Sequence, residues 1–210
     1  MTNPNISHFE PTIEERLDEL ADISEIVNEF MRVERATSRE GRPETDGEHT
    51  LHAMFLGVAY AAKYHPELNP GDVALMFMIH DFDEVHVGDI NSLTADDATM
   101  AAKEAAEAES RDFLRQKFAN HPFMLNLMER YWAQGDAEAL FTRGFEKNDP
   151  SYAHIRDGGR AIRSMGITDR DTYATLNERA IERMSTYASA DIVAMRRAMG
   201  RRVAEAVFTV

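Results

Sequence analysis

The sequence predicts an all-α helical bundle that forms a single domain. Apolar residues recur mostly at helical spacing, and the alternation of apolar and polar residues that is typical of strands is nearly absent. With 210 residues the chain is long enough to bury one substantial core, and nothing in it requires a second domain. We therefore expect residues 1–210 to form one domain.

The helices are predicted from runs of apolar residues bounded by start and stop signals. The first, at about 12–36, follows a Pro-Thr start signal and has a 3.6-residue apolar stripe. The second, at about 48–64, opens at Glu48-His49, and Leu51 and Phe55 are expected to lie on its buried face. Further helices are expected at about 70–82, 96–118, 121–133, 136–148, 151–157 and 171–207. Breaks are expected at 39–43, 66–71, near 88, at 121–122 and at 158–166.

Two charged segments are interpreted as surface features. The Ala-rich, acidic stretch 96–110 favours a solvated helix over a binding surface. The last helix has a basic face that is expected to pair with neighbouring glutamates, and a role in binding phosphate or a partner is the alternative. The arginines of this face are Arg179, Arg183, Arg196, Arg197, Arg201 and Arg202.

Charge and composition narrow the function. The chain carries 23 basic and 37 acidic residues, a net charge of -14, which repels a nucleic-acid backbone. Small phosphorylated ligands remain compatible, because a bound divalent cation reverses the field locally. Cysteine is absent, so any metal must be held by His, Asp, Glu and water.

No secretory signal is visible in residues 1–8, and no apolar run approaches the roughly 20 residues needed to cross a bilayer. We therefore expect a soluble, cytoplasmic protein that has no membrane partner.

A metal site is predicted where an apolar helix ends in His80-Asp81. These side chains must be partly desolvated there, and a divalent cation satisfies both groups at once. Another apolar helix begins near His49, and further carboxylates, Glu146 and Asp149, come from a later segment. Two imidazoles and carboxylates from three separated helices suit Mn, Fe, Co, Mg or Zn with open coordination positions.

These motifs resemble those of the HD-domain metal-dependent phosphohydrolases, and specifically the 5′-deoxynucleotidase branch. The resemblance rests on Glu48-His49, on the segment from His80 to Glu84, and on the Gly-Asp pair that ends at Asp89. It covers roughly residues 12–160, and about 167–210 would be a C-terminal helical extension. The chain lacks the Gly-Tyr-Pro motif of the related cyclic-dinucleotide phosphodiesterases.

The resemblance implies a ligand set. His49, His80 and Asp81 would bind the metal, and the last ligand of the family is normally an Asp on a later helix. Glu146 occupies that position by register, whereas Asp149, three residues on, has the expected residue type. Both are kept as candidates. The ion would be Co, Mn, Zn, Fe or Mg.

The resemblance also implies roles around the metal. Glu84 would be the acid/base group, and Asp89, also part of the catalytic site, would contact the sugar and favour deoxyribose. Arg35 and Arg42 would hold the phosphate. The family has an aromatic residue beside the first arginine, where this chain has Ala36, so the base and sugar of the substrate stay open. Of the two histidines near these motifs, His52 is interpreted as a neighbour of His49 on the same helix face, and His86 as a weaker candidate for the pocket or for a second metal.

The implied activity is hydrolysis of (deoxy)nucleoside 5′-monophosphates by attack of a metal-bound water. A deoxynucleoside triphosphohydrolase is one alternative, and a catalytically silent nucleotide-binding HD module is another. Related enzymes form homodimers, and the C-terminal helix offers a surface for such contact.

Overall fold

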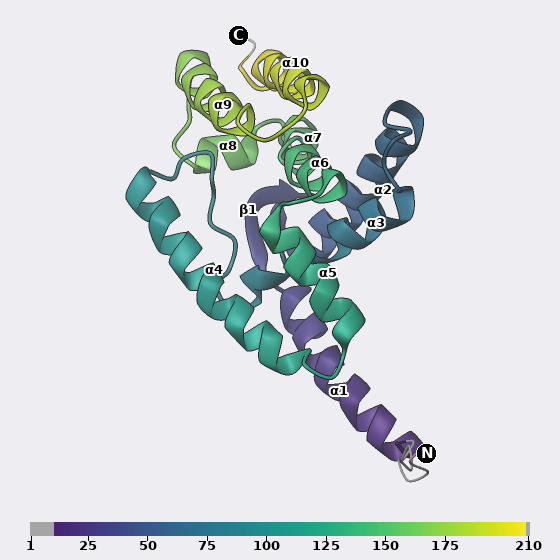
Figure 1. Ribbon diagram of the computed structural model, residues 1–210. Coiled ribbons are helices and arrows are strands. Elements are labelled where there is room, and N and C mark those ends of the chain that lie inside the picture. Colours follow the sequence, from purple (N-terminus) through teal and green to yellow (C-terminus); the bar gives the residue numbers. More distant parts are fainter. Residues whose placement is uncertain (1–10, 209–210) are drawn as a thin grey trace, which may run out of the picture.

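The computed structural model describes residues 11–208 as a helical bundle with one small hairpin (Figure 1). It confirms the all-α prediction. Residues 1–8, on which the prediction of no secretory signal rests, lie outside the described residues. The elements in chain order are α1 (Ile13–Phe30), β1 (Glu34–Arg39), β2 (Arg42–Thr45), α2 (Asp46–Tyr64), α3 (Pro70–Ile79), the 3-10 helix η1 (Phe82–Val85), α4 (Asp97–Lys117), α5 (Pro122–Ala133), α6 (Ala137–Glu146), α7 (Pro150–Arg156), α8 (Arg160–Ser164), α9 (Arg170–Met184) and α10 (Ala190–Val207).

The first predicted helix is too long, because α1 ends at Phe30 and a hairpin follows. Strands β1 and β2 pair antiparallel, with Arg39 opposite Arg42. The two residues between them, Glu40 and Gly41, have φ values of 52° and 88°, as a tight type I′ hairpin turn requires. The strands are short and rich in charge, so they lack the apolar alternation by which strands are recognised.

Helix α2 begins directly after the hairpin and packs closely on α3. Thr45 and Glu48 form a capping box at its first turn. The prediction that Leu51 and Phe55 are buried is wrong, since both are exposed. The buried face carries small residues instead: a Cβ atom on Gly57 would lie 2.2 Å from the Phe77 ring. Small side chains on this face let the two helices approach each other.

Helix α3 ends at Ile79, three residues before the predicted end. His80 caps it, and Asp81 leaves the helical conformation with φ -105° and ψ 14°. The amide of Glu84 then donates to the Asp81 carbonyl oxygen at 2.9 Å and starts η1. The His-Asp pair therefore lies at the corner between two helices.

The predicted helix at 171–207 is two helices, α9 and α10. The hydroxyl groups of Ser185 and Thr186 donate to carbonyl oxygens at the end of α9, which is a common way to close a helix. The short helix α8 lies inside the segment expected to be a break, at 158–166. Helix α10 packs against α9 and α7.

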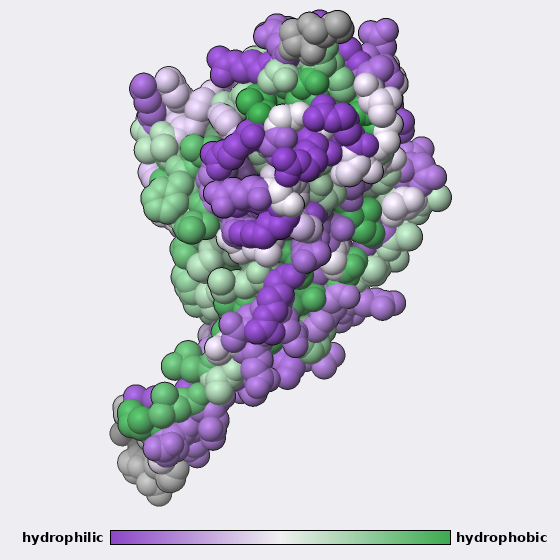
Figure 2. All heavy atoms as spheres, turned by 180° about the vertical axis from the view of Figure 1, so that it is seen from behind, coloured by the Kyte–Doolittle hydropathy of each residue, from purple (hydrophilic) through white to green (hydrophobic). Residues whose placement is uncertain are grey.

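The apolar core consists of contiguous clusters in the body of the molecule. Helix α1 joins one of them only through its last turns, where Ile26 and Phe30 are buried. Its first turns project from the body and leave Ile13, Leu17 and Leu20 exposed (Figures 1 and 2). Among the described residues, no helix has the length and apolar character that spanning a membrane requires.

Candidate metal centre

Three predicted ligands converge at the corner after α3. His49 from α2, His80 and Asp81 each offer one donor atom, and these atoms lie within 4.8 Å of one another. The Nε2 atom of His80 is 3.0 Å from Asp81 Oδ2, and that of His49 is 3.7 Å from the same oxygen. All three residues are buried.

The other nitrogen of each imidazole is held from behind. His80 Nδ1 donates to the carbonyl oxygen of Phe77 at 2.7 Å, and His49 Nδ1 lies 3.0 Å from Asp149 Oδ2. Protons on Nδ1 leave the Nε2 lone pairs facing Asp81, and neither buried Nε2 atom has a hydrogen-bond partner. Acceptors that face a carboxylate need a cation between them, so the donor set fits a divalent metal.

The two candidates for the last ligand lie in different places. Both carboxylate oxygens of Asp149 contact histidines: Oδ2 contacts Nδ1 of His49, and Oδ1 is 2.6 Å from Nδ1 of His52. It therefore lies behind His49 and fixes that ring. Glu146 is buried at the end of α6, where its Oε1 atom is 2.6 Å from Lys147 Nζ. Neither residue belongs to the three-residue group within the described part of the chain.

Arg35, from β1, lies among the acidic residues. Its Nη1 atom donates to Asp46 Oδ1 at 2.6 Å and to Asp81 Oδ2 at 2.9 Å, and it is 3.8 Å from Glu84 Oε2. Burial and the nearby Asp81 raise the pKa of Asp46 to about 7, although Arg35 opposes the shift. The guanidinium thus neutralises part of a dense acidic cluster.

Glu84 is buried in η1 and held by a lysine from α4. Its Oε1 atom accepts a hydrogen bond from Lys103 Nζ at 2.6 Å, and its buried Oε2 atom has no hydrogen-bond partner. Burial and Asp81 raise the pKa of Glu84 well above its ordinary value, although Lys103 and Arg35 oppose this. A carboxyl group in such surroundings holds a proton more readily than an exposed one, which suits an acid/base role.

Asp89 also reaches the cluster, from the turn after η1. Its Oδ2 atom accepts the backbone N–H of Ala36 at 3.1 Å, and its Oδ1 atom is 4.0 Å from Arg35 Nη2. Gly88 precedes it with φ +76°, a conformation that favours glycine. The turn therefore ties the acidic side chain to the hairpin.

The structure does not bring every predicted residue to this cluster. Arg42 lies on β2 with its guanidinium exposed and bound to Glu48, and it does not line the cavity beside the metal site. His52 contacts Asp149, and the His86 ring packs edge-to-face against the Phe113 ring.

Asp46 and Lys103 were missed by the sequence analysis. Asp46 precedes His49 by three residues, so the helical period places both on one face of α2, a signal that was available. Lys103 lies in the stretch predicted to be solvated, yet it is buried against Glu84. That prediction is wrong at this position. The one sequence signal for the burial of Lys103 is that it is the single basic residue within the acidic stretch 96–110.

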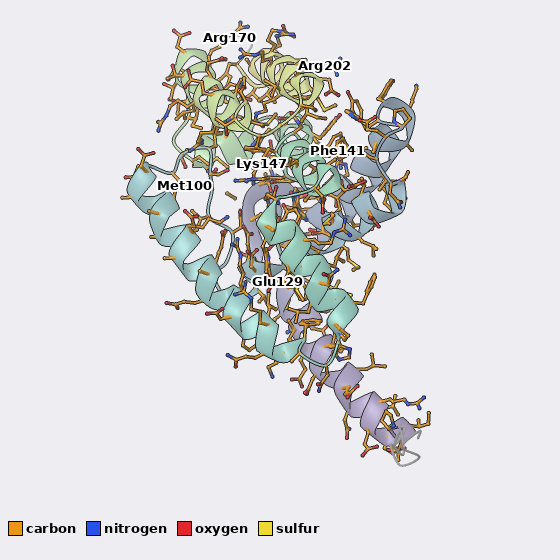
Figure 3. The ribbon with its side chains drawn as sticks, in the orientation of Figure 1. Met100, Glu129, Phe141, Lys147, Arg170 and Arg202 are labelled. Carbon is orange, nitrogen blue, oxygen red and sulfur yellow. The ribbon has the colours of Figure 1, made fainter. Side chains whose placement is uncertain are left out.

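A cavity of about 680 Å³ adjoins the cluster. Arg35, Asp81 and Glu84 line it. Basic residues at the end of α6 and on the C-terminal helices line it as well, and Lys147, labelled in Figure 3, lies between α4 and α6. These basic residues are Arg143, Lys147, Arg183 and Arg196.

Comparison with known proteins identifies the class of the chain. A profile of the HD domain family matches residues 26–187, so the chain belongs to the HD domain family. This confirms the HD-domain part of the predicted resemblance, whereas the 5′-deoxynucleotidase branch stays a prediction. The family and the donor set together indicate a divalent metal ion, whose identity they leave open.

A solved structure shares the fold. The crystal structure of a predicted metal-dependent phosphohydrolase from Magnetospirillum magnetotacticum MS-1 is 23% identical and superimposes with a TM-score of 0.70. The match covers 95% of this chain and 99% of that chain. No curated protein sequence matches the chain.

Proposed function

We propose that this protein is a metal-dependent phosphohydrolase that releases phosphate from (deoxy)nucleoside 5′-monophosphates. One observation carries the proposal: the unpartnered Nε2 atoms of His49 and His80 face Asp81, beside the buried carboxyl group of Glu84. Membership of the HD domain family supports it, as does the description of the M. magnetotacticum protein as a predicted metal-dependent phosphohydrolase.

The histidine pair and Asp81 would hold the ion, with Glu146 as the preferred fourth ligand. When bound, a divalent ion polarises phosphoryl oxygens and lowers the pKa of a water molecule. Asp149 would act from behind by keeping the His49 ring in the orientation that turns Nε2 toward the cluster.

Arg35 would bind the scissile phosphate. It lines the cavity, and its Nη1 atom already donates to two carboxylates. A phosphate oxygen can replace one of these acceptors, because the planar guanidinium matches phosphate geometry. Binding of substrate would then shift Arg35 from Asp46 toward the phosphate.

Glu84 would exchange the proton. Its Oε2 atom has no hydrogen-bond partner, so it can accept a proton from the attacking water or give one to the leaving 5′-oxygen. Lys103 holds the other oxygen and limits how the side chain can turn. Asp89 would accept a hydrogen bond from the sugar, at the edge nearest the hairpin.

A nucleotide panel tests this function. Purified protein supplied in turn with Mn, Co, Zn, Fe and Mg is expected to release inorganic phosphate from 5′-monophosphates. Glu84→Gln is expected to lower turnover by about 10²-fold or more while metal binding is retained. Full activity of Glu84→Gln would contradict the assigned role.

Hydrolysis of deoxynucleoside triphosphates is a second candidate. It is favoured by the basic residues Arg143, Lys147, Arg183 and Arg196 of the cavity lining, which exceed what one phosphate group requires. Release of tripolyphosphate instead of phosphate in the same panel would identify it. A silent binding module would bind nucleotides without product release, and the buried Glu84 beside the ligands argues against it.

The predicted homodimer and the cytoplasmic location belong to the proposal as well. The homodimer would use the C-terminal helix, and light scattering of the purified chain measures its mass directly.

A further inference from the structure

A buried arginine on α10 lies outside the segment that matches the HD domain family. Arg196 is 8% exposed and lines the same cavity as Asp81 and Glu84. Both of its hydrogen bonds are made by Nη1, at 2.6 Å to the Lys147 carbonyl oxygen and at 3.5 Å to Ser151 Oγ. Its buried Nε atom has no partner.

The other buried cations of the cavity differ from Arg196 in one respect. Arg35 contacts Asp46 and Asp81, and Lys103 contacts Glu84. Arg196 has no carboxylate oxygen within 4.0 Å among residues 11–208. A guanidinium stays charged in proteins, so its burial without a counter-ion is costly.

The protein supplies only part of the missing negative charge. The Lys147 carbonyl group is at the C-terminal end of α6, where the helix dipole is negative. That dipole stabilises a cation by less than the penalty for an unpaired buried charge. The charge of Glu146 also acts on Arg196, but Glu146 is paired with Lys147 at 2.6 Å, so no carboxylate among residues 11–208 contacts the Arg196 guanidinium.

The surroundings of Arg196 are aromatic and mostly basic, and Glu146 is the nearby carboxylate. The Arg143 guanidinium lies over the Tyr187 ring, 4.3 Å from its centroid. Burial raises the pKa of Tyr187, and Lys147, Arg143 and Arg196 all act against that shift, which places these three cations around one phenol group. This basic wall occurs in a chain with a net charge of -14.

We propose that Arg196, with Lys147 and Ser151, forms a subsite for a second phosphate group of the substrate. The inference rests on the proposed function, since it places the second phosphate in the cavity where the first is hydrolysed. Arg196 supplies a planar fork of donors and Ser151 a hydroxyl donor, and Lys147, which is paired with Glu146, adds a point charge; these groups together match phosphate oxygens. The preferred substrate is then a nucleotide that carries a second phosphate besides the 5′-phosphate that is hydrolysed, either linked to it as an anhydride or carried on another sugar position.

Binding of inorganic pyrophosphate and inorganic phosphate to the full chain tests the subsite by calorimetry. Arg196→Met is expected to weaken pyrophosphate binding by about tenfold or more, the worth of a charged hydrogen bond. Arg197→Met is the matched control, because Arg197 is the next residue on α10, is half exposed and pairs with Glu178. It is expected to leave binding unchanged.

Kinetics distinguish the two sources of the second phosphate. Nucleoside 5′-triphosphates, nucleoside 3′,5′-bisphosphates and 5′-monophosphates are compared in wild type and Arg196→Met. A rise in KM for the triphosphate alone assigns the anhydride source, and a rise for the bisphosphate alone assigns the separate phosphate. The KM of the monophosphate is expected to stay the same in both proteins.

Arg196 could instead serve only as a cap of α6. In that case Arg196→Met would lower Tm and leave pyrophosphate affinity unchanged, which overturns the proposal. If Arg196→Met does not fold, Arg196→Lys keeps the charge but loses the fork, and unchanged pyrophosphate binding there also overturns it. Loss of pyrophosphate binding in a protein that hydrolyses no nucleotide would retain the subsite and reject the proposed function. If the wild type hydrolyses monophosphates and Arg196→Met binds pyrophosphate as tightly as the wild type does, the proposed function is retained and the subsite is rejected.

Discussion

Replacing Asp149 by Asn is expected to weaken metal binding while the fold persists. The carboxylate accepts from Nδ1 of His49 at 3.0 Å and from Nδ1 of His52 at 2.6 Å. An amide keeps one acceptor oxygen, so it can serve only one of the two rings, and an NH2 group facing His49 would move the proton of that ring to Nε2. Loss of such an orienting partner typically costs 10–100-fold in metal affinity, or about 1.4–2.7 kcal/mol.

The assay is a competition titration of the metal against a chromophoric chelator at constant pH. Asp191→Asn is the control, because Asp191 also bonds a histidine, His65, at 2.8 Å, but lies elsewhere on the surface. Unchanged affinity in Asp149→Asn would show that the carboxylate does not orient His49. A loss as complete as that of His80→Ala would show that Asp149 is a direct ligand, and either result refutes the reasoning.

Three further predictions concern stability, each measured by urea unfolding. Gly57→Ala is expected to cost about 1–3 kcal/mol, because its Cβ atom would overlap the Phe77 ring; an unchanged midpoint would mean that α2 and α3 are not so close. Burial lowers the pKa of His154 to about 4, so the unfolded chain binds the extra proton and stability falls as pH drops from about 6.5 toward 4. His154→Gln should therefore gain about 2 kcal/mol relative to wild type between pH 7.5 and pH 5, and a constant difference would argue against a neutral buried imidazole. Lys103→Met is expected to cost about 1–3 kcal/mol at pH 7, because it leaves Glu84 buried without its partner; a cost near zero would mean that the ion pair is not formed.

The sequence was informative wherever a motif and a helical period coincide. The apolar run before His80 predicted a desolvated His-Asp pair, and the helix at His49 predicted a second imidazole. The structure brings His49 together with His80 and Asp81. The helical character of most segments was also predictable, because the period of the apolar residues reflects which side of a segment is buried.

The remaining features depend on tertiary packing that one sequence does not display. Arg35 contacts its carboxylates because the hairpin places β1 beside α2. The hairpin is rich in charge and has no apolar alternation, so the sequence did not predict it. Lys103 and Arg196 are ordinary basic residues of amphipathic helices in sequence. Their burial becomes visible only when α4 and α10 are placed against the cavity.

We predict that His49, His80 and Asp81 hold one divalent ion. Calorimetric titration of chelator-treated protein with Mn²⁺ or Co²⁺ tests it most directly, with His80→Ala and Arg197→Met in parallel. We predict one tightly bound ion per chain in wild type and in Arg197→Met, and none at this site in His80→Ala. Equal binding by His80→Ala and wild type, or no binding by either, would mean that these three residues do not form a metal site.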